Sequence, residues 1–168
     1  MESKKINSKI KVLFICLGNI CRSPAAHLIF EKKFKEKFPH HQLVVDSAGT
    51  SRNHHGEFTD LRMQKLLKQN GYVEKKMARG LRTADILEFD YLICMDDSNF
   101  KNTCDFFRNN NSNLKLEDLK KIKLMKDFDP TFSLKEIADP YYGAERDFQL
   151  TINNLEKCID HFLLGLNS

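Results

Sequence analysis

The feature that most constrains the fold is a regular alternation of short apolar runs with longer amphipathic segments. Short runs rich in Val and Ile are typical of strands buried inside a sheet. The runs lie at residues 11–15, 42–45, 90–95 and 121–125. Strands that alternate with helices predict a parallel sheet covered on both faces. We therefore expect an α/β fold, a single doubly wound domain with a four-stranded parallel sheet in the flavodoxin-like order 2-1-3-4.

The first amphipathic segment follows directly after the first apolar run. Its apolar residues recur every four positions and share one helix face: Ala26, Phe30, Phe34 and Phe38. Ser23 is a favoured N-cap residue, and Pro24 tolerates the first helical position, which needs no N–H donor. We expect a helix that begins after Ser23 and ends at Pro39.

Further helices are expected after the other runs. The segment after Thr59 has one apolar face and a glycine stop at Gly71. That face carries Met63, Leu66, Leu67 and Asn70. Another helix is expected to start at residues 96–98, before an asparagine-rich stretch, residues 109–113, that predicts a solvated loop. The last helix has the clearest periodicity, with Phe148, Ile152, Leu155, Ile159, Phe162 and Leu166 on one face.

Composition excludes several classes of protein. The 168 residues suit one domain, and 41% hydrophobic with 30% charged residues is neither a disordered nor a membrane-spanning composition. A net charge of +4 is too mild to indicate nucleic-acid binding. Residues 1–9 read as a polar N-terminal extension without a secretory signal, so a cytoplasmic protein is expected. The odd number of cysteines predicts reduced thiols: Cys16, Cys21, Cys94, Cys104 and Cys158.

The junction between the first run and the first helix carries the strongest functional signal. Open α/β sheets bind ligands at the carboxyl ends of their strands. At this junction Cys16 is followed, after five residues, by Arg22 and Ser23, a spacing that chance would produce roughly 0.02 times in this chain. Successive backbone N–H groups that lead into a helix N-terminus form a site for a tetrahedral anion.

The residue types in this loop suit an anion site built around a nucleophile. Gly18 permits a positive φ, and Asn19 is the next most tolerant residue type, with a side chain that can tie the loop together. Arg22 can bind two phosphate oxygens in a bidentate fork. Helix N-termini and cations favour the thiolate form of a cysteine such as Cys16, to which Ser23 can donate a hydrogen bond.

The sequence of this loop, CLGNICRSP, resembles that of low-molecular-weight protein tyrosine phosphatases. The likeness continues through DSAGTS, Gly71-Tyr72, Ala78-Arg79, FDYLICMDDSN and DPYYG, in the family's order. It implies one phosphatase domain over residues 10–168. It also implies a phosphate-binding loop in which Cys16 and Arg22 are supported by Leu17, Gly18, Asn19, Ile20, Cys21 and Ser23.

The resemblance also implies a two-step reaction on phosphotyrosine proteins or small aryl phosphates, which releases inorganic phosphate. Cys16 attacks phosphorus, and Arg22 with the loop amides holds the phosphate oxygens. Asp139 protonates the leaving phenol and then deprotonates water. Alone, the DPYYG segment reads as an ordinary turn, and its role as the acid loop depends on the resemblance. Neither a metal nor another cofactor is expected, since the loop supplies the positive field that Mg²⁺ supplies in kinases.

The same resemblance outlines the substrate pocket. Leu17, Tyr141 and Tyr142 are expected to flank an aryl ring. Asn53 stands where the family often has an aromatic residue, so His54 is a candidate polar substitute. Lys76 is a second departure, because many animal members have a histidine there that supports the loop serine.

The cysteines divide into several roles. The family pattern implies a reversible Cys16–Cys21 disulfide under peroxide, which protects the nucleophile from over-oxidation. Cys94 and Cys158 are expected in the core, and Cys104, near a loop, is the one expected to be exposed.

Three other functions compete with the main interpretation. An arsenate reductase of the same fold would relay a disulfide, a part that Cys94 and Cys104 would have to play. A phosphoarginine phosphatase is similar but typically has Thr where this chain has Ile20. A non-catalytic phosphotyrosine-binding protein would lack a nucleophile or an acid, whereas Cys16 and Asp139 are both present. The expected assembly is a monomer, with a weak dimer as the alternative.

Overall fold

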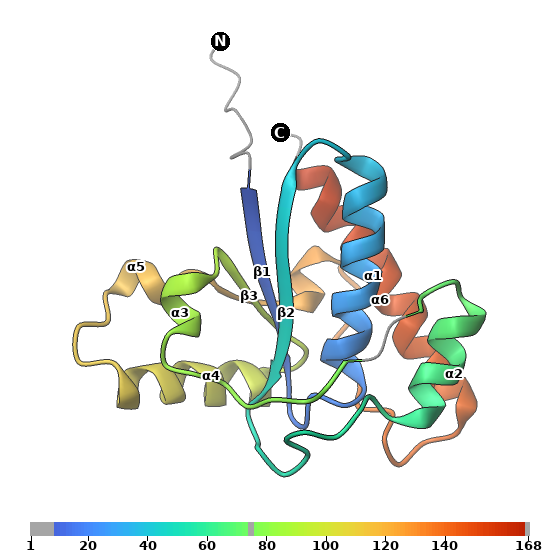
Figure 1. Cartoon of the computed structure of the whole chain (residues 1–168), viewed down its shortest axis with the longest axis horizontal. Helices are drawn as coiled ribbons and strands as arrows, with labels where there is room; N and C mark the ends of the chain where they lie inside the picture. Colours follow the sequence, from blue (N-terminus) through green and yellow to red (C-terminus); the bar gives the residue numbers. More distant parts are fainter. Residues whose placement is uncertain (1–8, 74–75, 167–168) are drawn as a thin grey trace.

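The computed structural model describes residues 9–73 and 76–166. Its centre is a parallel four-stranded sheet in the order β2-β1-β3-β4, as predicted (Figure 1). The strands are β1 (Lys9–Cys16), β2 (Gln42–Gly49), β3 (Tyr91–Cys94) and β4 (Ile122–Leu124). The proposed N-terminal extension lies almost wholly outside the described residues, and β1 begins at Lys9, its last residue.

The register brings the carboxyl ends of three strands to one edge. Cys16, the last residue of β1, pairs with Gly49, the last residue of β2. On the other side of β1, Ile15 pairs with Cys94 at the end of β3. The loops that leave these strands therefore start within a few ångströms of one another, at the lower edge in Figure 1.

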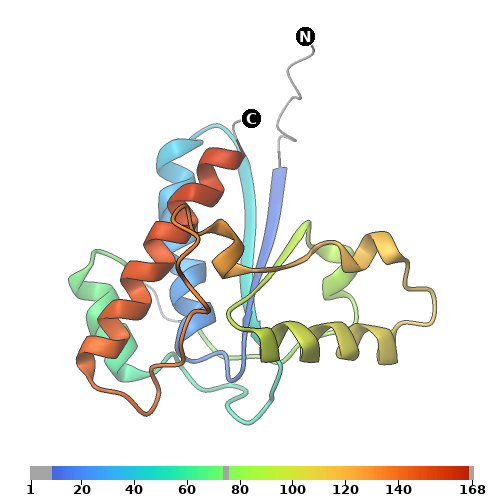
Figure 2. The ribbon, with the colours of Figure 1, turned by 180° about the vertical axis from the view of Figure 1, so that it is seen from behind.

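Helices cover both faces of the sheet. The long helices α1 (Arg22–Lys37) and α6 (Glu145–Gly165) lie on one face, with α2 (Leu61–Gln69) beside them (Figures 1 and 2). On the other face lie α3 (Asp85–Glu88), α4 (Asp97–Asn110) and α5 (Leu116–Leu119). A 3-10 turn, η1 (Met125–Phe128), follows β4. The short elements α3, α5 and η1 were not expected, because a single turn shows no measurable periodicity.

Each face of the sheet has its own core, and β1 contributes to both by alternation. Val12, Phe14 and Cys16 belong to the core under α1 and α6, whereas Leu13 and Ile15 belong to the core under α4. The predicted apolar faces of α1, α2 and α6 are confirmed. Aromatic rings meet around Phe30 of α1. Its ring centroid is 5.5 Å from that of Phe14 in β1 and 5.5 Å from that of Phe162 in α6.

The structure corrects two predictions about the helices. Helix α1 starts at Arg22, with Cys21 as N-cap and no side-chain cap, so Ser23 is a buried helical residue rather than the N-cap. Helix α4 extends into the asparagine-rich stretch as far as Asn110, and the loop begins only there. The predicted start of α4 is confirmed, because the Asp96 side chain accepts a hydrogen bond from the amide of Asn99.

The expectation that Cys104 is exposed was wrong. It is 8% exposed and belongs to the core under α4. The segment after residue 98 has weak apolar periodicity, so the sequence did not show which face of this helix is buried. Cys94 and Cys158 are buried as expected. No helix in the described part of the chain has the length and apolar character needed to cross a membrane.

Candidate active site

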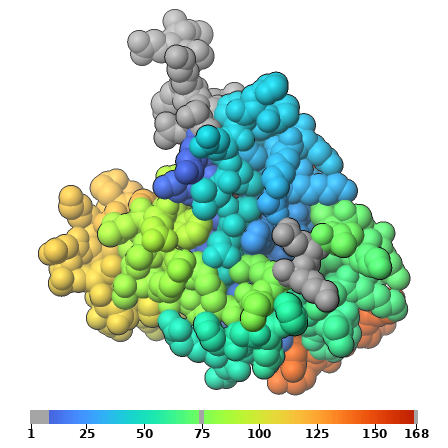
Figure 3. Space-filling view, viewed as in Figure 1, coloured from blue at the N-terminus to red at the C-terminus, as the bar shows by residue number. Residues whose placement is uncertain are grey.

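A cavity of about 220 Å³ opens at the carboxyl edge of the sheet. Its walls come from the β1–α1 loop, the segment after β2 and the loop before α6. The lining residues are Cys16, Leu17, Gly18, Ile20, Cys21, Arg22, Ser51, Asn53, His54, Asp139, Tyr141 and Tyr142. In the space-filling view the segment after β2 and the loop before α6 meet along the lower edge of the molecule (Figure 3).

Cys16 lies at the base of this cavity and is 3% exposed. The backbone amide of Asn19 donates a hydrogen bond to its Sγ atom, 3.3 Å away. The Oγ atom of Ser23 lies 3.0 Å from the same sulfur. Both groups can donate a hydrogen bond to the sulfur, so they fix its position in the cavity.

Asn19 organises the loop from behind the cavity. Its φ is 58°, and its side-chain amide donates to Ser23 Oγ and to Ser47 Oγ, each at 2.8 Å. Its Oδ1 atom accepts a hydrogen bond of 3.0 Å from the amide of Arg79. Asn19 therefore ties the β1–α1 loop to β2 and to the segment after α2.

Of the two residues that tolerate a positive φ, Asn19 adopts the left-handed conformation and Gly18 does not. Gly18 leaves room for a neighbouring side chain. A Cβ atom there would lie 3.0 Å from Cδ2 of His54, so the His54 ring would have to shift slightly.

The Arg22 side chain is 3% exposed and reaches the cavity from the first residue of α1. Its Nη1 atom donates to Asp96 Oδ2 at 2.6 Å and to the carbonyl oxygen of Ile137 at 2.9 Å. Its Nη2 atom lies 3.5 Å from Asp139 Oδ2. Burial opposes the charge of this guanidinium, but Cys16 and the two carboxylates outweigh it and raise the pKa of Arg22.

Asp139 lies beside Arg22 in the cavity, and its side chain is 43% exposed. Its Oδ1 atom accepts a hydrogen bond of 3.1 Å from the amide of Tyr141. The chain leading to Asp139 is anchored by the amide of Ile137, which donates to the carbonyl of Met95 at the end of β3. We name residues 139–143 the acid loop.

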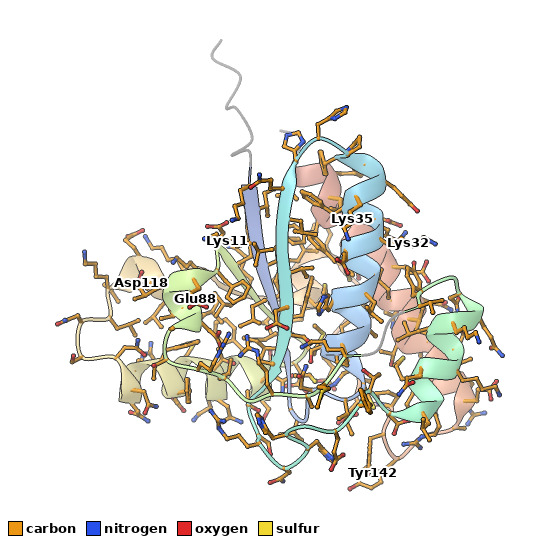
Figure 4. The ribbon with its side chains drawn as sticks, in the orientation of Figure 1. Lys11, Lys32, Lys35, Glu88, Asp118 and Tyr142 are labelled. Atoms are coloured by element: carbon orange, nitrogen blue, oxygen red, sulfur yellow. The ribbon has the colours of Figure 1, made fainter. Side chains whose placement is uncertain are left out.

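The outer walls of the cavity combine apolar and polar groups. Leu17 is 50% exposed and Tyr142 is 97% exposed. The Tyr142 side chain lies at the lower edge of the molecule and projects outward (Figure 4). The His54 ring lies 6.3 Å from the Tyr141 ring, and its Nδ1 atom is 2.7 Å from a carboxylate oxygen of Glu57. Asn53 also lines the cavity, so the structure brings together every residue predicted for the pocket.

Several residues that support the site were not singled out from the sequence. Asp96 and Ser47 make the contacts described above, and Ser51 lines the cavity. The Asp46 carboxylate forms two ion pairs. Its Oδ1 atom is 2.7 Å from Nζ of Lys76, and its Oδ2 atom is 2.8 Å from Nε of Arg79. DSAGTS and CMDDSN contain Asp46 and Asp96, but nothing local assigns these carboxylates to an arginine or lysine far away in the sequence.

Cys21 also lines the cavity and is 4% exposed. Burial, together with the nearby charges of Asp60 and Cys16, raises the pKa of its thiol. Cys21 is therefore a neutral thiol beside Cys16. In the described part of the chain, no three His, Cys, Asp or Glu residues are grouped so that they could hold a metal ion.

The chain is an α/β protein of the phosphatase class, and its cavity lies where the first strand joins the first helix. Residues 11–168 match the family described as low molecular weight phosphotyrosine protein phosphatase. The chain belongs to this family, and it is a protein tyrosine phosphatase, a hydrolase.

The similarity extends over nearly the whole chain. The low molecular weight phosphotyrosine protein phosphatase of Gallus gallus is 39% identical, with 90% of this chain and 92% of the relative covered. Among solved structures, a protein tyrosine phosphatase from Entamoeba histolytica is 36% identical, with a TM-score of 0.85, and the match covers 94% of this chain and 96% of that one. A Drosophila arginine phosphatase is 28% identical, with a TM-score of 0.87, and 95% and 99% of the two chains are covered.

Proposed function

We propose that this phosphatase hydrolyses phosphotyrosine in proteins, and small aryl phosphates, through a cysteinyl-phosphate intermediate. The observation that supports this most strongly is the convergence of Cys16, Arg22 and Asp139 on one cavity. The Asn19 amide and Ser23 face the Cys16 sulfur, and Asp96 fixes the guanidinium of Arg22.

In the first step the Cys16 thiolate attacks phosphorus, so that a sulfur–phosphorus bond forms and the bond to the phenolic oxygen breaks. Arg22 and the loop amides hold the remaining phosphate oxygens, and Asp139 transfers its proton to the phenolate. In the second step a water molecule attacks phosphorus and gives a proton to Asp139. The sulfur–phosphorus bond then breaks and inorganic phosphate leaves.

A phosphoarginine substrate is the second candidate, since one of the similar structures is a Drosophila arginine phosphatase. Ile20 lines the cavity of this chain. A branched apolar side chain at this place favours the flat, apolar ring of a phenol over a charged guanidino group. We therefore favour the aryl ester.

Arsenate reduction has less support. A disulfide relay needs further cysteines near Cys16, but Cys94 and Cys104 are buried in the core on the opposite face of the sheet. The Cys94 thiol contacts Thr103 at 3.6 Å, and burial raises its pKa to about 12. Both groups would have to leave that core to reach Cys16.

The proposal is tested with wild type, Cys16→Ser and Asp139→Ala on a phosphotyrosine peptide and on p-nitrophenyl phosphate. We expect near-complete loss of activity in Cys16→Ser. Asp139→Ala should lower kcat by roughly 100-fold or more on the peptide and by less on the better leaving group. A matched phosphoarginine peptide tests the second candidate, and faster turnover of that peptide would reverse our preference. Full activity in Cys16→Ser would refute the mechanism.

We also propose that peroxide oxidises Cys16 and that Cys21 then captures it as a disulfide. The presence of both thiols in one cavity supports this reaction. Peroxide takes two electrons from Cys16 to give a sulfenic acid, and the Cys21 sulfur displaces water from it. Mass spectrometry should find a loss of two hydrogens after mild peroxide, and recovery of activity with dithiothreitol. A stable sulfinic acid on Cys16 in its place would contradict the proposal.

A further inference from the structure

The guanidinium of Arg62 lies against two aromatic rings that come from different elements. Its Cζ atom is 5.3 Å from the centre of the Tyr141 ring in the acid loop. It is also 4.6 Å from the centre of the Phe148 ring in α6. A cation over an aromatic face is attracted by the negative potential of the ring. Arg62, in the first turn of α2, therefore links α2 to the acid loop and to α6.

Asp60 holds this guanidinium in place with two hydrogen bonds. Nη2 of Arg62 donates to Oδ2 at 2.8 Å, and Nε donates to Oδ1 at 3.1 Å. The backbone amide of Asp60 in turn donates to the carbonyl of Ile20 in the phosphate-binding loop, at 2.8 Å. A continuous set of contacts thus runs from the phosphate-binding loop through Asp60 and Arg62 to the ring of Tyr141.

The Tyr141 backbone is directly coupled to Asp139, because its amide donates to Oδ1 of Asp139 at 3.1 Å. The Asp139 carboxyl is 43% exposed, and its other polar contact is the longer one of 3.5 Å to Arg22. Its position therefore depends strongly on the backbone of the acid loop. Arg62 does not line the cavity, and its contact with the acid loop is made to the ring of Tyr141.

We propose that Arg62 is a positioning residue for the acid loop. By holding the Tyr141 ring, it keeps the Asp139 carboxyl aligned to protonate the leaving group. The inference rests on the proposed function, in which Asp139 is the general acid. It assigns to Arg62 a role in leaving-group protonation and none in phosphate binding.

The test uses two aryl phosphates that differ in the basicity of the leaving group. Phenyl phosphate needs the acid, because its leaving group has a conjugate acid with a pKa of about 10. p-Nitrophenyl phosphate needs it less. In Arg62→Met, which retains the apolar stem, kcat/KM should fall by roughly tenfold on phenyl phosphate and by less than about threefold on p-nitrophenyl phosphate. Arg62→Ala should show the same division between substrates, and inhibition by inorganic phosphate should change less than about twofold.

Lys65→Ala is the matched control. Lys65 is on the same helix, and its ammonium forms an exposed ion pair with Glu145 in α6 instead of lying over the Tyr141 ring. This variant should treat the two substrates as wild type does. Equal effects of Arg62→Met on both substrates, or the same substrate dependence in Lys65→Ala, would refute the role of Arg62.

A double variant separates this inference from the proposed function. When Asp139→Ala is already present, Arg62→Met should cause no further loss specific to phenyl phosphate, because the group that Arg62 positions is gone. If Asp139→Ala itself shows no dependence on the leaving group, the acid assignment fails. If Asp139→Ala shows it and Arg62→Met does not, only the inference about Arg62 fails.

Discussion

The guanidinium of Arg22 is bound to the carboxylate of Asp96, with 2.6 Å between Nη1 and Oδ2. Arg22 comes from the first residue of α1, and Asp96 is the N-cap of α4, on the other face of the sheet. The pair therefore joins the two layers of helices at the cavity. Nη1 of the guanidinium is bound to Asp96, whereas Nη2 is directed toward Asp139 and the cavity.

Replacing Asp96 with Asn should weaken the binding of phosphate, because the fork of Arg22 loses its charged anchor. We expect kcat/KM to fall by about 10- to 100-fold on phenyl and p-nitrophenyl phosphate alike. Inhibition constants for inorganic phosphate should rise in parallel. Asp97→Asn is the control, since Asp97 is exposed and pairs with Lys126 at the surface. Tighter phosphate binding in Asp96→Asn would mean that Asp96 competes with phosphate for the guanidinium.

Asn19 contributes both a backbone conformation and a side chain, and two substitutions separate these effects. Asn19→Gly removes three hydrogen bonds but tolerates the φ of 58°. Each bond contributes about 1 kcal/mol, so the free energy of unfolding should fall by about 2–3 kcal/mol. Asn19→Ala should lose about 1 kcal/mol more, because alanine is strained in the left-handed region. Denaturant unfolding measures both values, and equal stability of the two variants would exclude backbone strain at this residue.

Asp46 should make stability depend on pH in the acid range. Burial opposes its ionisation, but the hydrogen bond and charge of Lys76 and the charge of Arg79 outweigh burial and lower its pKa to about 2. A carboxyl whose pKa is lower in the folded state stabilises the protein above its unfolded pKa of about 3.9. About 2 kcal/mol should be lost as the pH falls from about 5 to 2. Asp46→Asn should lack this part of the pH dependence, and parallel unfolding curves for both proteins would contradict the assignment.

His27 should make the free energy of unfolding depend on pH in a higher range than Asp46 does. Burial, reinforced by the charge of Lys76, lowers its pKa to about 4. Because the unfolded chain takes up this proton near pH 6.5 and the folded chain does not, stability is full above that pH and declines as the pH falls to about 4. The expected loss is roughly 2–3 kcal/mol between pH 7 and 4. His27→Gln should remove this decline, which thermal unfolding at several pH values would detect. If the decline persists in the variant, other groups cause it.

Sequence reasoning was most reliable where one local pattern determines the outcome. Continuous apolar runs identified the four strands, and helical periodicity identified the apolar faces of α1, α2 and α6, because both signals are visible along the chain. The prediction of Ser23 as the N-cap was wrong, and Asn19 rather than Gly18 is the left-handed residue, since both features depend on how the loop closes around the Cys16 sulfur. The burial of Cys104 also depended on packing rather than on local pattern.

The local spacing of Cys16, Arg22 and Ser23 is enough to predict a phosphate-binding loop, because these residues are near neighbours along the chain. The residues that support this loop depend on tertiary packing. Asp96 reaches Arg22, Ser47 reaches Asn19, and Arg62 reaches Tyr141 across separations of 74, 28 and 79 residues. The folding of the parallel sheet determines such partners, because it brings the carboxyl ends of its strands to one edge. No segment of the chain encodes these contacts locally.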